Sequence, residues 1–272
     1  MPSKVETVSS FIEAAPPGQL QNVLDDIKAL TIDEPQLTKN LDPAFKKYNE
    51  EQFATVKLPG SSGLVIVSKH NSLGDNKYYD SASSTSFTFD HTSQTASNAQ
   101  SYSSSSSHSD LVKSLSKSVA QHASEHYPSA ATGVFPSSDD SSIAIVTVAN
   151  KYSLNNFWSG RWRSVYTLNP SSSSLSGSIK VDVHYFEDGN VRMQTDKAVE
   201  VKVSGTSAAE IVRQIATAEK KYQEDLNRGF AQLNEGVFKG LRRQLPVTRQ
   251  RVEWDKVGAY RLGQDIGGGR SR

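Results

Sequence analysis

Two histidines and a glutamate stand at the spacing found in one class of zinc-dependent hydrolases: His122, Glu125 and His126. On a helix, this spacing would place both imidazoles on one face beside a carboxylate that could act as a general base. However, Pro128 closes the helix directly after His126, and no convincing downstream acidic motif offers a third ligand. We interpret the pair as solvated histidines near a helix C-terminus, where imidazolium is favoured, and expect no metal. A metallopeptidase using these three residues stays open as a rival hypothesis.

Other catalytic patterns are missing from the sequence. It contains no phosphate-binding GxxxxGK[ST] loop, no GxGxxG and no GxSxG, and the four remaining histidines lack ligand spacing. The absence of cysteine excludes disulfides, cysteine-zinc sites and thiol catalysis, and it agrees with a reducing compartment. No apolar stretch approaches the roughly 18 residues of a membrane span, and no secretory signal is visible. We therefore expect a cytosolic protein that is not an enzyme and has no cofactor.

A cluster of aromatic and basic residues at 158–163 could be read as a platform for stacking nucleic-acid bases. It contains Trp158, Arg161, Trp162 and Arg163, next to Gly160. Aromatic residues at the start of a strand more often fill a contact between sheets or subunits, with arginine stacked on tryptophan. We favour this structural interpretation and expect no nucleic-acid partner.

The most unusual feature is the charge of the C-terminal segment. Residues 239–272 hold nine Lys/Arg against three acidic residues, a local charge of +6, whereas the whole chain carries only +1. Arg242 and Arg243 could compensate the negative end of a helix, but basic residues continue beyond Pro246 to Arg261. Basic and apolar side chains alternate irregularly there, up to Trp254. Such a cationic, amphipathic extension is typically presented to an acidic partner.

The elements that must carry this segment follow from the periodicity of apolar residues. Three short helices broken by prolines are expected within residues 7–53, then strands at 64–67 and 86–89. Half of the residues at 92–109 are serine, which favours a mobile loop, and a helix is expected at 110–127.

Residues 143–203 alternate with a period of two and predict a meander of antiparallel strands, with 143–150 as a central strand. A polar loop is expected at 171–174, and Asp188-Gly189 is typical of a tight type I′ hairpin turn. The longest helix is expected at 207–243, where Ser207 and Glu210 form a capping box. At about 1.5 Å per residue it would span roughly 50 Å, enough to cross a sheet and extend past its edge.

The fold class predicted from the residues is therefore α+β: a helical N-terminus, a central antiparallel sheet crossed by a long C-terminal helix, and a basic amphipathic tail. The expected segments, within one structural domain, are 1–55 (helices), 56–142 (small strands, Ser-rich loop and helix), 143–204 (central sheet), 205–245 (long helix) and 246–272 (tail).

Several strings of low degeneracy stand out along the chain. They are Leu-Arg-Arg-Gln-Leu-Pro-Val-Thr-Arg at 241–249, followed by Trp254, together with segments at 14–18, 48–58, 156–164 and 183–191. Together they resemble one known family, the α subunit of the heterodimeric F-actin capping protein. The resemblance runs from about residue 8 to about residue 262. The Ser-rich segment 92–109 and the last residues, 263–272, differ from animal members, and we interpret the chain as a fungal member.

The resemblance implies a mushroom-shaped heterodimer with a β subunit. The N-terminal helices would form its stalk, two central sheets would join into one, and the C-terminal "tentacle" would cap the barbed end of the actin filament without calcium. It implies cortical actin in the cytoplasm as the location, and regulators that bind the stalk. The implied actin contacts are Lys239, Arg242, Arg243, Arg249, Arg251 and, as an apolar anchor, Trp254. Phosphoinositide lipids would inhibit capping through Lys239, Arg243 and Arg249.

A rival from another class is a peripheral scaffold that binds anionic phospholipid through the same basic tail, at about 1 kcal/mol per basic residue. Binding to filament ends in lipid-free solution would distinguish the two.

Overall fold

The computed structural model describes residues 2–61, 63–187, 189–203, 205, 207–233 and 236. The chain divides into two compact units, Met1–Ala218 and Glu219–Arg272. The first unit contains all of the strands found among the described residues, and the architecture below is that of this unit.

The N-terminal helices are α1 (Lys4–Glu13), α2 (Leu20–Leu30), the 3₁₀ helix η1 (Pro35–Asn40) and α3 (Asp42–Gln52). They share one apolar cluster in which Ile12, Ile27 and Phe45 are almost fully buried. The three expected helices are thus confirmed, with η1 as an additional turn. Each helix is too short to be stable alone, so this shared cluster is what holds them in place.

Two small sheets follow. Strands β1 (Ala54–Lys57) and β2 (Leu64–Val67) form a hairpin, and a short 3₁₀ helix, η2 (Lys69–Asn71), leads into a four-stranded sheet. That sheet has the order β3-β4-β5-β6, comprising Ser72–Gly74, Lys77–Asp80, Thr85–Asp90 and Thr95–Ser101. The two sheets share an apolar cluster that includes Val67, Tyr78, Phe87 and Phe89.

Strand β6 corrects one prediction, because it lies inside the Ser-rich segment expected to be a mobile loop. The strand pairs antiparallel with β5, for example Phe89 with Ala96, although most of its side chains are exposed. An edge strand is held by backbone hydrogen bonds to one neighbour, and those bonds do not require apolar side chains. Serine content therefore did not exclude a strand at this position.

The central sheet has five antiparallel strands in the order β11-β10-β9-β8-β7. They are β7 (Ala130–Pro136), β8 (Ile143–Ser153), β9 (Trp158–Asn169), β10 (Ser174–Tyr185) and β11 (Val191–Lys202), with the 3₁₀ helix η3 (Leu154–Asn156) between β8 and β9. The expected meander is confirmed, and β8 is an interior strand with β7 and β9 on either side, whereas β7 was not predicted. The connection from β10 to β11 corrects another prediction: Tyr185 pairs with Val191, so five residues rather than two join the strands.

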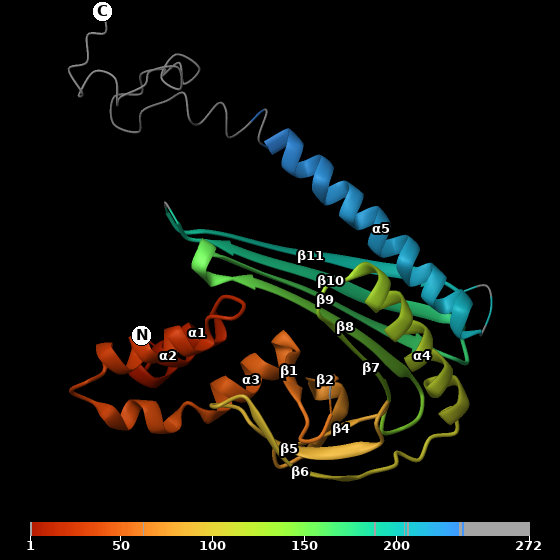
Figure 1. Cartoon of the computed structure of the whole chain (residues 1–272), viewed down its shortest axis with the longest axis horizontal. Coiled ribbons are helices and arrows are strands. Elements are labelled where there is room, and N and C mark those ends of the chain that lie inside the picture. The colour runs from red at the N-terminus through yellow and green to blue at the C-terminus, as the bar shows by residue number, and fades with distance from the viewer. Residues whose placement is uncertain are drawn as a thin grey trace, which may run out of the picture. The chain divides into compact units, whose positions relative to one another are not determined.

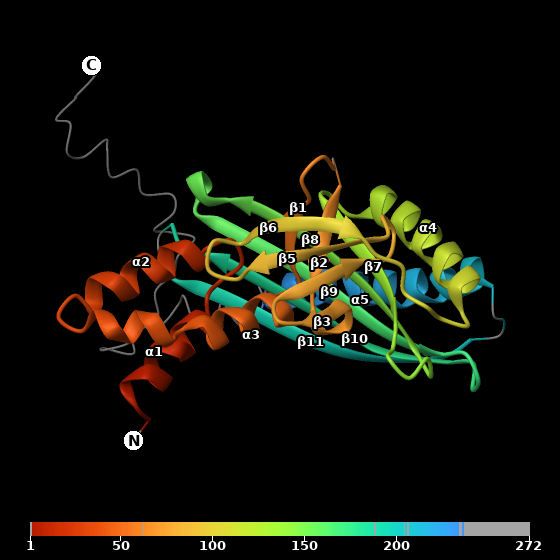
Figure 2. The same cartoon turned by 90° about the horizontal axis from the view of Figure 1, so that it is seen from below.

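The two faces of this sheet are covered differently (Figure 1). Helix α4 (Ser109–His126) and the first turns of α5 (Ala208–Gln232) lie on one face. The small sheets and the N-terminal helices lie on the other, as Figure 2 shows from below. Ser207 begins α5 as expected, its hydroxyl accepting a hydrogen bond from the Glu210 amide at 3.3 Å. The rest of the predicted helix, to residue 243, lies outside the described residues except for Leu233 and Gly236.

Candidate binding surfaces

The residues predicted to contact actin all follow the last described position of the chain. They are Lys239, Arg242, Arg243, Arg249, Arg251 and Trp254, and each lies outside the described residues. The structure describes the preceding part of the chain, which contains a buried polar network and an open sheet edge.

The histidine pair lies in the last turn of α4. The Nδ1 atom of His126 is 2.9 Å from the backbone oxygen of His122, and the two rings are 4.5 Å apart. Glu125 accepts a hydrogen bond from the Gln121 amide at 3.1 Å. Over the described ranges, no group of three or more His, Cys, Asp or Glu residues is arranged to hold a metal ion. Nor does any helix in those ranges combine the length and apolarity that crossing a bilayer requires.

The arginines of the 158–163 cluster bind the end of helix α3. Arg161 is buried and donates to Asn150 Oδ1 at 2.7 Å, Gln52 Oε1 at 3.2 Å and the Tyr152 hydroxyl at 2.7 Å. Arg163, also buried, donates to the backbone oxygen of Glu51. A cation is favoured at this position because the carbonyl groups at a helix C-terminus carry partial negative charge.

The expected stacking of these arginines on tryptophan is wrong. Successive side chains of a strand point to opposite faces of the sheet, which separates Arg161 and Arg163 from Trp162. Trp162 packs instead against Tyr127 at the end of α4, with 5.6 Å between ring centroids. The structural interpretation of this cluster therefore stands, but the arginines join sheet to helix rather than sheet to sheet.

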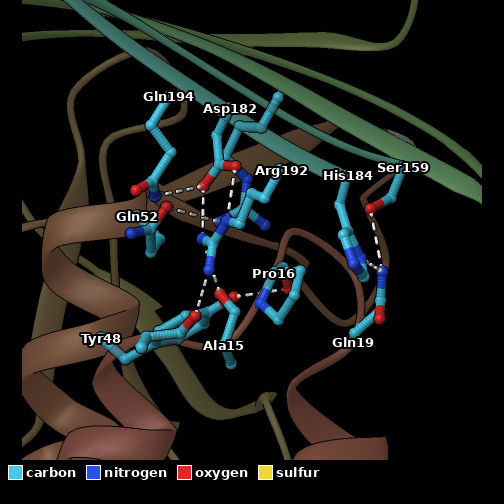
Figure 3. A network of polar contacts seen from close by, with 12 residues as sticks. Ala15, Pro16, Gln19, Tyr48, Gln52, Ser159, Asp182, His184, Arg192 and Gln194 are labelled. Carbon is cyan, nitrogen blue, oxygen red and sulfur yellow. Dashed lines mark hydrogen bonds and ion pairs between the residues drawn. The ribbon is translucent and has the colours of Figure 1, made fainter. Parts of the chain in front are cut away.

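A buried polar network fixes the loop between α1 and α2 on the sheet (Figure 3). Arg192 on β11 forms a two-pronged ion pair with Asp182 on β10, with distances of 2.9 and 2.6 Å. The same guanidinium donates to the backbone oxygens of Ala14 and Ala15. Gln194 adds a third hydrogen bond to Asp182 at 3.1 Å, so both oxygens of the buried carboxylate accept hydrogen bonds.

The second half of the network centres on Gln19. Its side-chain nitrogen lies 2.7 Å from His184 Nδ1 and donates to Ser159 Oγ at 3.1 Å. Because the amide donates to Nδ1, the proton of the imidazole lies on Nε2, which is 3.0 Å from Asn190 Oδ1. Every polar atom of the imidazole thus has a partner, as buried polar groups require.

The outer strand β11 forms an open sheet edge. Among the described residues its hydrogen-bonded neighbour is β10 alone, along all 12 residues of Val191–Lys202. Large apolar side chains are exposed at its start and on the neighbouring strand β10: Val191 is 62 % exposed, Tyr185 39 % and Val183 36 %. A long edge strand with exposed apolar neighbours is a ready template for pairing with another chain.

Comparison with known structures and sequences gives the class of protein to which this fold belongs. The fold is similar to that of a homodimeric actin capping protein alpha subunit from Plasmodium berghei, with a TM-score of 0.74, 21 % identity, and coverage of 89 % of this chain and 97 % of that one. The sequence profile of the F-actin capping protein alpha subunit family matches residues 8–265.

Curated relatives agree over their full length. The chain is 61 % identical to the F-actin-capping protein subunit alpha of Gibberella zeae, covering 99 % of both chains, and 59 % identical to that of Neurospora crassa, covering 100 % of both. The chain therefore belongs to the F-actin capping protein alpha subunit family. This confirms the family resemblance found in the sequence, including its similarity to fungal members.

The polar network was not found by sequence reasoning. The segment 14–18 was singled out only by family resemblance, and nothing in it indicated a partner such as Arg192, which is 177 residues from Ala15. The available signal was the run of polar residues on one face of an otherwise alternating strand, Asp182 and His184. Polar side chains on a buried face must find partners, so this run predicts a polar contact without naming it.

Proposed function

We propose that this chain is the α subunit of a heterodimer that caps the barbed end of the actin filament and blocks both addition and loss of subunits, without calcium. The observation that carries the proposal is the extent of the family match, residues 8–265, which includes the whole basic segment 239–254. No other segment of the chain combines that charge with interleaved apolar residues. The proposed location is the cytoplasm, at cortical actin.

The open edge of β11 supports assembly with a β subunit. Addition of a partner strand would satisfy the free backbone groups of the edge and lie beside Val191, and other parts of the partner would cover Val183 and Tyr185 on the next strand. The two central sheets would then be continuous, and helices α1–α3 would form this subunit's share of the stalk of a mushroom-shaped particle. Regulators that bind the stalk would meet these helices.

Two neighbouring proline substitutions test this mode of assembly, Lys197→Pro and Ala198→Pro. Successive N–H groups of a strand point to opposite sides, so one variant loses a hydrogen bond to β10 and the other loses an N–H on the free side. We expect one variant to lower the melting temperature and the other to preserve the fold but prevent co-purification with the β subunit. Equal co-purification of both folded variants would contradict pairing at this edge.

The basic segment provides the proposed contact with actin. Lys239, Arg242, Arg243, Arg249 and Arg251 would meet acidic actin surface, and Trp254 would anchor the segment in an apolar site. Charges at the rim of such a contact mainly accelerate association, whereas desolvated charges slow dissociation. Lys239, Arg243 and Arg249 would also bind phosphoinositide headgroups, which makes lipid and actin mutually exclusive ligands.

The experiment is filament elongation from barbed-end seeds with the purified heterodimer, in a calcium chelator and without lipid. We expect the heterodimer to inhibit elongation and phosphoinositide micelles to reverse the inhibition. Binding to anionic vesicles with no effect on elongation would support the rival function, a lipid-bound scaffold.

A further inference from the structure

A cationic groove runs between helix α3 and the face of the central sheet that the N-terminal helices occupy. It measures about 900 Å³ and is lined by residues of α3, η2, β9 and β10. Five cationic side chains line it, against two carboxylates, those of Glu50 and Glu51. The cations are Lys46, Lys47, Lys69, Arg163 and Lys180.

The cation at the buried end of the groove contacts the C-terminal end of α3 but has no carboxylate partner. Arg163 is 9 % exposed, its Nε has no hydrogen-bond partner, and the guanidinium donates to the Glu51 backbone oxygen. Burial and then the neighbouring charge of Arg161 lower the pKa of Arg163 to about 10, which leaves it protonated at neutral pH. Neither guanidinium forms an ion pair with a carboxylate of the described residues. Buried charges in proteins are ordinarily paired, so Arg163 lacks an anion in direct contact.

The acidic residues nearby do not pair with Arg163. The charges of Asp182 and Glu51 favour its protonated form, but neither forms an ion pair with it, and Asp182 is bound by Arg192. Glu50 accepts a hydrogen bond from the Tyr78 hydroxyl at 2.7 Å, on the side of the four-stranded sheet. Lys47 and Lys180 pair with Glu13 at 2.6 Å and Asp196 at 3.3 Å, but both pairs are about half exposed. Exposed ion pairs contribute little free energy, so these lysines can exchange their partners for a ligand at small cost.

We propose that this groove binds an acidic, extended segment of a partner polypeptide, with one carboxylate at Arg163 and others at the lysines of the rim. The volume is much larger than a single ion requires and lies in the range of sites that enclose sizeable ligands. No residue of β11 lines the groove, so the site is separate from the edge proposed for the β subunit. It is separate in sequence from the basic segment proposed for actin as well.

Fluorescence anisotropy with the full heterodimer tests the proposal. The probe is a fluorescein-labelled peptide of alternating glutamate and serine, and its glutamine analogue is the uncharged control. The test variant is the double charge reversal Lys46→Glu and Lys69→Glu at the rim. The matched variant is Lys113→Glu and Lys117→Glu on α4, which changes the net charge equally on the opposite face of the sheet.

We expect the glutamate peptide to bind, the glutamine peptide not to bind, and the rim variant alone to weaken binding at least tenfold while still capping filaments. Absence of binding, or equal weakening by the α4 variant, would overturn the proposal. Protection of residues 163–180 from hydrogen exchange by the β subunit alone would also overturn it and assign the groove to the subunit interface. The capping readout separates these outcomes from failure of the proposed function.

Discussion

Two segments pack on the same face of the central sheet by different means. The small sheets meet β7 and β8 through an apolar cluster that includes Ile66, Tyr79, Phe135 and Val146. The N-terminal helices meet β9, β10 and β11 through polar groups, chiefly Arg192, Asp182, Gln19, His184 and Arg161.

The difference separates stability from positioning. Apolar contact is non-directional and supplies most of the free energy of folding. Replacing buried ion pairs by apolar residues is often neutral or stabilising, so the network contributes little net energy. Its value is directional, because Arg192 can reach both Asp182 and the carbonyl groups of Ala14 and Ala15 in only one placement of the loop. We infer that the apolar cluster stabilises the body, and that the polar network fixes where the helices lie.

The largest expected effect is that of Phe135→Ala. Phe135 is 1 % exposed and packs edge-on against Tyr79, so its removal leaves a cavity between the sheets. We expect the free energy of unfolding to fall by about 3–5 kcal/mol, measured by urea denaturation of the heterodimer. Phe157→Ala, at a ring that is 43 % exposed, is the matched control and should cost far less. Equal losses would mean that the cluster is not the main apolar core.

A smaller effect is expected from Asp182→Ala, about 3 kcal/mol, because it strands the guanidinium of Arg192 in a mostly buried position. The double variant Asp182→Ala, Arg192→Leu should recover much of that loss. It should nevertheless increase hydrogen exchange in residues 14–19, since the loop is no longer fixed. If the double variant is no more stable than Asp182→Ala, the ion pair between Asp182 and Arg192 itself stabilises the protein, which would contradict a purely positioning role.

Two glycines with similar backbones isolate the contact of the loop with the sheet. Gly18 has φ +75° and a Cβ there would lie 3.0 Å from the Tyr152 ring, whereas Gly60 has φ +79° and nothing within 4 Å. Gly60→Ala should cost about 1 kcal/mol for the left-handed backbone alone. Gly18→Ala should cost about 2 kcal/mol, because the ring must also move. Identical melting temperatures for the two variants would show that Tyr152 does not constrain the loop.

The smallest effect expected is a dependence of stability on pH through His91, which joins α3 to the four-stranded sheet. Burial is the main cause of a lowered pKa of His91, and the charge of Lys46 lowers it further. The charges of Glu50, Asp90 and Asp42 act in the opposite direction but do not cancel the effect of burial. The unfolded chain then binds more protons than the folded one below the ordinary value of 6.5, so stability falls as the pH drops through that value. The slope from one group is at most about 1.4 kcal/mol per pH unit.

His91→Gln should therefore reduce the change in the urea denaturation midpoint between pH 7 and pH 5. The flattening should be partial, because burial lowers the pKa of His70 as well. An unchanged pH profile would show that His91 does not contribute to the pH dependence of stability.

Elements with strong periodicity were predictable from the sequence, and contacts between distant segments were not. Alternation at 143–203 predicted the sheet, and the apolar steps near Leu24 and Ile27 predicted α2. Strand β7 was missed because Ala-Ala-Thr-Gly at its start carries no alternation, and β6 because its side chains are polar. The polar network could not be predicted, since it depends on which residues the fold brings together across more than a hundred positions. The predicted actin-binding residues stay a prediction.

The most direct test of the proposed function is filament elongation, at two salt concentrations, with the heterodimer carrying Lys239→Ala, Arg243→Ala and Arg249→Ala. Truncation of desolvated charges costs about 2–5 kcal/mol each, so capping should weaken by orders of magnitude while the heterodimer still assembles. Salt should slow association of the wild type more than that of the variant. Unchanged capping, or a loss that merely follows loss of the heterodimer, would contradict the assignment of actin binding to the basic segment.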